Sequence, residues 1–168
     1  MDSKEFGLVA AQQLFHVEDI HYGFWEKDEP STIGNFKEAQ KKHTQFLFRH
    51  IENYIENKNQ SKLLDIGCGI GNTTKKLLNK GYKVDGLVPY PWMARYASNI
   101  TSKYKSQDRG TIYECKFEDF PINEIKEKYQ LVFFSESFQY VNMKSTFNVL
   151  GKILEKNSTI VIFDFFKK

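Results

Sequence analysis

A glycine-rich turn is the segment of this sequence with the clearest capacity for chemistry. An apolar run over residues 62–66 leads directly into Gly67, Gly69 and Gly71, and a helical pattern follows. Glycine lets the backbone turn tightly and lets a ligand approach without a Cβ clash, and a helix start adds free N–H groups. The G-x-G-x-G spacing differs from the G-x-G-x-x-G of dinucleotide folds, because Asn72 occupies the sixth place. The segment therefore predicts a ligand-binding loop of another kind.

Two other segments carry side chains that bind ligands or move protons. His21-Tyr-Gly-Phe-Trp25 is dense in rings, which either close over a cationic ligand or pack against the sheet edge. Glu136 and Tyr140 follow an apolar run, and Glu136 is a candidate general base, a helix cap or an exposed acid. His43 shares a helical face with His50 and has no partner at metal-ligand spacing, so a packing or surface role and no metal site are expected.

The elements that must position these residues alternate between strand and helix. Helices are predicted over 1–15, 35–57, 73–79, 91–104 and 143–154, and strands over 62–66, 82–88, 111–115, 129–135 and 158–166. Such alternation predicts a parallel sheet covered on both faces, an open doubly wound α/β fold with ligands at the carboxyl ends of the strands. Residues 1–168 are predicted to form one domain, with helices and an aromatic loop in 1–60 and the sheet in 61–168.

Composition excludes several classes of protein. The net charge is only +3, with 24 basic and 21 acidic residues, which argues against a nucleic-acid partner. No apolar run approaches the ~20 residues of a membrane span, and the first residues lack the pattern of a signal peptide. Two cysteines cannot form a disulfide framework, so a cytoplasmic location is expected. Aromatic residues make up 15% of the chain, which fits a bulky core or a pocket for a flat or apolar molecule.

The segment Asp65-Ile-Gly-Cys-Gly-Ile-Gly71 resembles motif I of the class I S-adenosylmethionine-dependent methyltransferases. The similarity covers roughly residues 20–166. It includes residues 21–25, similar to the entry segment of small-molecule enzymes such as the cyclopropane-synthase and sterol or tocopherol types, and residues 133–141, similar to the fourth-strand motif. The resemblance implies S-adenosylmethionine as cofactor, with Asp65 and the loop backbone holding its methionine part.

The same resemblance implies a wider set of site residues. The cofactor-binding set is Tyr22, Asp65, Gly67, Cys68, Gly69, Gly71, Val88, Phe117 and Ser135, and the candidate catalytic residues are Glu136, Tyr140 and His21. The sequence departs from the family at two cofactor positions. Val88 stands where an acidic residue usually binds the ribose, and Asp85, three residues earlier, is expected on the opposite face of the strand. Lys116 stands where an aspartate often lies near the adenine, with Glu118 or Asp119 as stand-ins.

The resemblance also bears on the end of the sheet. It implies strand order 3-2-1-4-5, without the family's usual final antiparallel strand pair, because the sequence stops two residues after the fifth strand. The fifth strand is then an apolar edge, with Ile162 expected to face a buried layer, and a homodimer or a partner subunit is expected to cover it. Two functions remain open: methyl transfer to a small apolar or aromatic acceptor, and a non-catalytic methyltransferase-like subunit that supports a partner chain.

Overall fold

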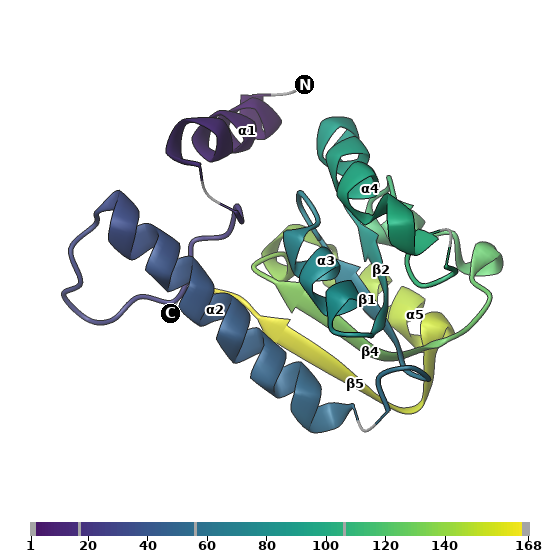
Figure 1. Ribbon diagram of the computed structural model, residues 1–168. Helices are drawn as coiled ribbons and strands as arrows, with labels where there is room; N and C mark the ends of the chain where they lie inside the picture. The colour runs from purple at the N-terminus through teal and green to yellow at the C-terminus, as the bar shows by residue number, and fades with distance from the viewer. Residues whose placement is uncertain (1–2, 17, 56, 106, 166–168) are drawn as a thin grey trace.

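A computed structural model describes residues 3–16, 18–55, 57–105 and 107–165 as helices arranged around one five-stranded sheet (Figure 1). All strand pairs are parallel and the order is β3-β2-β1-β4-β5, which confirms the predicted fold. The strands are β1 (Lys62–Ile66), β2 (Lys83–Leu87), β3 (Ile112–Tyr113), β4 (Tyr129–Ser135) and β5 (Leu154–Phe163). The helices are α1 (Ser3–Phe15), α2 (Ile33–Tyr54), α3 (Asn72–Asn79), α4 (Pro91–Lys105) and α5 (Met143–Ile153), with short 3₁₀ helices η1 (Phe117–Asp119), η2 (Ile122–Glu124) and η3 (Phe138–Tyr140).

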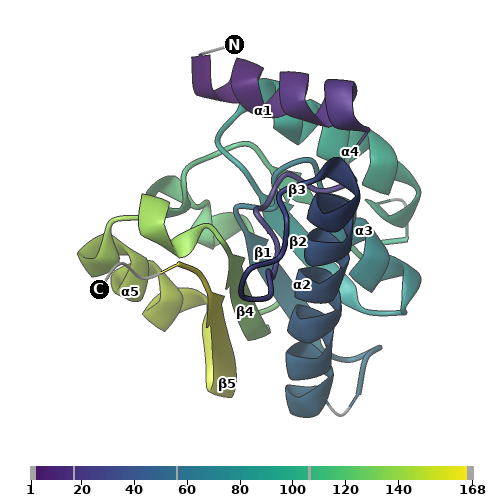
Figure 2. The same ribbon diagram turned by 90° about the vertical axis from the view of Figure 1, so that its left-hand side faces the viewer.

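Two apolar layers flank the sheet because successive strand residues point to opposite faces. Leu63 lies in the layer under α2, α3 and α4, whereas its neighbour Leu64 lies in the layer under α5, η1 and η2. Figure 2 shows α5 on one side of the sheet and α2 on the other. This arrangement brings the carboxyl ends of β1 and β4 to the same edge, beside the N-terminal half of α2 and the loop before it.

The fifth strand differs from its prediction in bounds and in burial. It begins at Leu154 rather than 158, and residue 166 lies outside the described residues. The expectation that Ile162 faces a buried layer is wrong, because Ile162 is 37% exposed. Its cross-strand partner Phe134 is buried under α5, but β5 lies one strand beyond, where the cover is incomplete. Val161, on the opposite face, packs against the α2 layer.

Candidate functional site

The glycine loop between β1 and α3 has a backbone conformation that requires glycine. Gly67, Gly69 and Gly71 all have positive φ, at 80°, 55° and 80°. A Cβ on Gly67 would lie 2.4 Å from the Ser137 side chain, and a Cβ on Gly71 would lie 2.7 Å from Ala97 Cβ. The predicted turn is therefore present, and its helix starts directly after it.

Asp65 lies just before this loop and is 1% exposed. Its Oδ2 accepts a hydrogen bond of 2.7 Å from Thr74 Oγ1 on α3. Burial raises the pKa of Asp65 to about 7, although the Thr74 hydroxyl acts in the opposite direction. The carboxyl group is therefore poised between its neutral and charged forms near neutral pH, and a cation beside it would favour the charged form.

The second strand carries an apolar residue at the position expected to bind a ribose. Val88 is 3% exposed and packs in a cluster with Cys68 and Met93. Asp85 forms its hydrogen bonds on the opposite face of the strand from Val88, as expected from its position three residues earlier. Its carboxylate accepts hydrogen bonds from Tyr129 Oη at 2.7 Å and from the amide of Thr111 at 2.8 Å. Asp85 is thus a structural residue that joins neighbouring strands.

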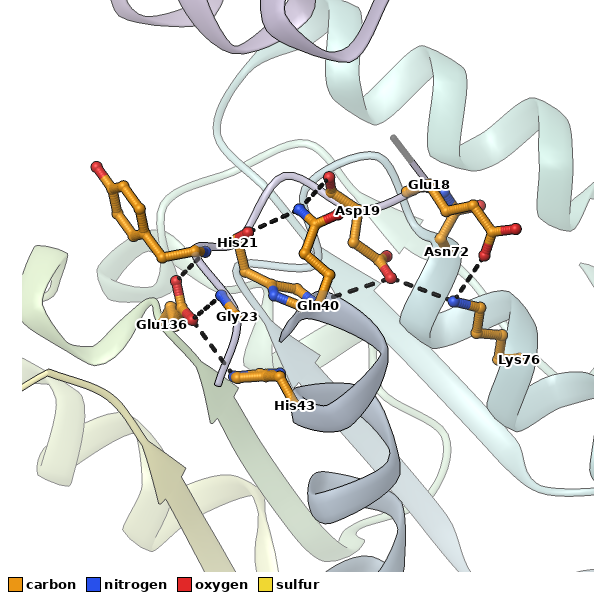
Figure 3. A network of polar contacts seen from close by, with 10 residues as sticks. Glu18, Asp19, His21, Gly23, Gln40, His43, Asn72, Lys76 and Glu136 are labelled. Atoms are coloured by element: carbon orange, nitrogen blue, oxygen red, sulfur yellow. Dashed lines mark hydrogen bonds and ion pairs between the residues drawn. The ribbon is translucent and has the colours of Figure 1, made fainter. Parts of the chain in front are cut away.

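The aromatic loop closes over the end of β4 through its backbone. The amides of Tyr22 and Gly23 donate to Glu136 at 2.7 and 3.2 Å (Figure 3). The amide of Phe24 donates to the carbonyl of Ala39 on α2 at 2.9 Å. The Tyr22 ring, for which a place over the cofactor and packing against the sheet edge were both open, is 65% exposed and meets Phe165 edge-on. Ring packing adds to these main-chain hydrogen bonds, because Phe24 lies against Phe46 and Phe163 and Trp25 stacks on Phe36.

His21 of this loop forms a cluster with His43 of α2 and with Glu136 (Figure 3). His43 Nε2 is 3.5 Å from Glu136 Oε1, and the two imidazole rings stack with centroids 4.1 Å apart. His21 Nε2 is 3.7 Å from Asp19 Oδ2, and Asp19 also pairs with Lys76. Two carboxylates therefore flank a pair of stacked histidines.

Burial shifts the protonation of this cluster toward neutral forms. The pKa of His43 is lowered to about 3. Burial is the main cause, the neighbouring His21 acts in the same direction, and Asp19 opposes the shift. Burial also raises the pKa of Glu136, against the effect of the Tyr22 and Gly23 amides. His43 is therefore neutral near pH 7, so its imidazole has a lone pair available for a ligand.

The structure brings together only part of the predicted site. His21, Glu136 and the Tyr22 backbone meet, whereas Tyr140 is 60% exposed on η3. Phe117, a predicted cofactor-binding residue, is buried in the α5-side layer, where it packs edge-on against Phe134. The remaining predicted cofactor residues lie at the loop or at the carboxyl ends of β2 and β4: Gly67, Cys68, Gly69, Gly71, Val88 and Ser135.

Sequence reasoning missed His43 and Ile20. His43 was expected to have a packing or surface role, and its 2% exposure and stacking on Phe163 confirm the packing. Its contact with Glu136 has no local signal, since the two residues are 93 positions apart. Ile20 lies over the glycine loop, with Cδ1 2.9 Å from where a Gly69 Cβ would be. Glu118, one of two residues proposed as stand-ins near the adenine, accepts a hydrogen bond from the amide of Asn142.

Comparison with known proteins identifies the family. Residues 63–157 match the model of a methyltransferase domain. The chain belongs to this family of class I S-adenosylmethionine-dependent methyltransferases. The match covers the glycine loop, Val88 and Glu136, and it leaves the aromatic loop outside.

Similar proteins share the fold with modest sequence identity. The chain is 26% identical over 133 residues to the chloroplastic tocopherol O-methyltransferase of Arabidopsis thaliana, covering 76% of this chain and 38% of that protein. It is also 26% identical over 133 residues to the malonyl-[acyl-carrier protein] O-methyltransferase of Acetivibrio thermocellus, covering 77% of this chain and 44% of that protein. The chain therefore spans about two fifths of the length of these curated relatives.

A solved methyltransferase structure has the same fold. It is the geranyl diphosphate C-methyltransferase of Streptomyces coelicolor A3(2), in complex with S-adenosyl-L-homocysteine, with a TM-score of 0.69 and 18% identity. The similarity covers 92% of this chain and 58% of that one.

Among the described residues, no helix combines the length and the apolar character needed to cross a membrane.

Proposed function

We propose that this chain binds S-adenosylmethionine at the glycine loop and takes part in methyl transfer to a small apolar or aromatic acceptor. The loop between β1 and α3 supports this proposal most directly, because its three left-handed glycines and the buried Asp65 form a backbone cradle beside a carboxylate. The methionine part of the cofactor carries an ammonium group, which is a suitable partner for Asp65. Ile20 must move aside for the cofactor to reach Gly69.

The acceptor side of the proposed reaction is the cluster at the end of β4. Methyl transfer is an in-line displacement, so its rate depends on alignment of the acceptor with the cofactor's methyl group. Glu136 lies at this edge of the sheet and burial raises its pKa, which suits removal of a proton from an acceptor hydroxyl or amine. Tyr140 is exposed and is a weaker candidate for this role.

The second candidate function is that of a non-catalytic subunit that binds and supports another chain. Val88 favours it, since an apolar side chain packed with Cys68 and Met93 offers no acceptor for the ribose hydroxyls. The partly exposed Ile160 and Ile162 of β5 are the surface that such a partner, or a second copy of this chain, would cover. Binding of the cofactor separates the two functions.

Replacing Asp65 with Asn is expected to change stability and cofactor binding in opposite directions. The native pKa of Asp65 is raised from 3.8 to about 7, so the folded state holds this proton more tightly than the unfolded state, and wild-type stability falls as pH rises from about 4 to 7. At pH 8 the Asn variant is therefore expected to be more stable by roughly 1–3 kcal/mol. It is expected to bind S-adenosylhomocysteine about 10 to 100 times more weakly, because the charged partner of the ammonium is lost.

Urea denaturation and calorimetry with S-adenosylhomocysteine measure these two effects. Wild-type affinity is expected to increase as pH rises through 7, where Asp65 ionises. The matched control is Asp108→Asn, which removes an exposed carboxylate paired with Lys126 and leaves binding unchanged. If the wild-type chain does not bind the cofactor at millimolar concentration, the catalytic function is rejected. The non-catalytic subunit is then the function that remains.

A further inference from the structure

The side chains of His21, His43 and Glu136 form a compact donor set from three distant parts of the chain. One ligand atom from each residue lies within 4.8 Å of the other two. His21 comes from the aromatic loop, His43 from α2 and Glu136 from the residue after β4 (Figure 3). The group lies at the carboxyl ends of the strands, which is where this class of sheet binds its ligands.

The imidazole nitrogens of this cluster are buried and make no hydrogen bond of normal geometry, although the Glu136 and Asp19 carboxylates lie 3.5 and 3.7 Å from them. Neither nitrogen of His43 nor either nitrogen of His21 has a hydrogen-bond partner in the described part of the chain. The His43 side chain is 2% exposed and that of His21 is 9% exposed. Buried polar atoms normally have hydrogen-bond partners, so two buried imidazoles whose nearest carboxylate oxygens lie 3.5 and 3.7 Å away favour a further ligand at this position.

The groups around the cluster hold it in position. The Tyr22 and Gly23 amides fix both oxygens of Glu136, and Gln40 Nε2 donates to the His21 carbonyl at 2.7 Å. Asp19 lies against His21, in the way that outer-shell carboxylates orient metal-bound histidines. Lys76 balances the charge of Asp19 at 3.2 Å.

We propose that His21, His43 and Glu136 bind a divalent transition-metal ion of the Zn²⁺ type. Two imidazoles and one carboxylate are the donor set of three-ligand zinc sites, which leave a further position for water or a substrate. Metal–nitrogen bonds of about 2.0–2.1 Å require the ligand atoms to approach one another more closely than they do now. The ion would satisfy the buried imidazoles and place an open coordination position beside the glycine loop.

Metal titration of the full chain tests this proposal. The chelator-treated protein is titrated with Co²⁺, followed by its visible absorption, and then with Zn²⁺ as competitor. We expect one Co²⁺ per chain, displaced by Zn²⁺. Failure of the wild-type chain to take up one equivalent of either ion would overturn the proposal.

Two variants and one control test the assigned ligands His43 and Glu136. His43→Phe keeps the stacking on Phe163 but removes both nitrogens, and Glu136→Gln removes the charge; each is expected to lower Zn²⁺ affinity by at least about tenfold. The control is His50→Gln, because His50 lies on the same helix and its Nδ1 is 2.9 Å from the Phe46 carbonyl oxygen. Circular dichroism checks folding. Unchanged affinity in either folded ligand variant, or equal loss in His50→Gln, contradicts the assignment.

Discussion

The Asp85→Ala variant is expected to lose about 3–5 kcal/mol of unfolding free energy, because it removes one partner of a buried charged network. Asp85 is 2% exposed, and Lys62 Nζ lies 3.0 Å from its carboxylate. The Tyr129 hydroxyl and the Thr111 amide also donate to Asp85, so three polar groups lose their acceptor together. Urea denaturation measures the loss, with the slope checked for two-state behaviour.

A surface ion pair provides the matched control for Asp85→Ala. Glu127 pairs with Lys83 at 3.3 Å, and both side chains are solvent-accessible, so Glu127→Ala is expected to cost less than about 1 kcal/mol. Tyr129→Phe removes a single donor to Asp85 and is expected to cost about 1–2 kcal/mol. A loss below 1 kcal/mol for Asp85→Ala would mean that the network does not hold the strands together.

Gly23→Ala is expected to release the aromatic loop from α2. Gly23 has φ +90°, and a Cβ there would lie 2.6 Å from the backbone carbon of Ala39 and 2.7 Å from the amide nitrogen of Gln40. Backbone atoms of a helix cannot move aside, so the clash and the left-handed conformation together cost about 2–5 kcal/mol. Hydrogen exchange is expected to show faster exchange of the Tyr22 and Phe24 amides, whose acceptors are lost.

Gly34→Ala is the control for Gly23→Ala. Gly34 lies in the first turn of α2, and a Cβ there approaches nothing closer than Thr32 Oγ1 at 4.0 Å. Alanine is the better helix former by roughly 0.5–1 kcal/mol, so this variant is expected to be neutral or slightly stabilised. Slow exchange at Tyr22 in Gly23→Ala would show that the loop is held by other contacts.

The alternation of strands and helices predicted a parallel sheet, whereas the order of its strands came from the family resemblance. Apolar runs located β1 and β4, and Pro91 located the start of α4. The start of β5 was misplaced because residues 154–157 are mostly polar and nevertheless continue from α5 directly into the strand. The prediction that Ile162 is buried was also wrong, because no sequence pattern indicates how far α5 extends over the sheet edge.

The candidate site was only half predictable for a related reason. The glycine loop is contiguous, so spacing alone identified Gly67, Gly69 and Gly71. The cluster under the aromatic loop depends on the path of residues 16–32, which have no periodic pattern. His43 has the spacing of a core residue on α2, and only the fold places Glu136 opposite it.

The hydrogen bonds from the aromatic loop to Glu136 have a consequence for how the protein folds and opens. The Tyr22 amide and Glu136 are 114 positions apart, and Glu136 reaches its place only after β4 has paired with β1. Closing so long a segment carries an entropic cost that local helices do not bear, so this contact is expected to form late. By the same reasoning it is among the first to break, and the His21–His43–Glu136 cluster would come apart while the central strands remain paired.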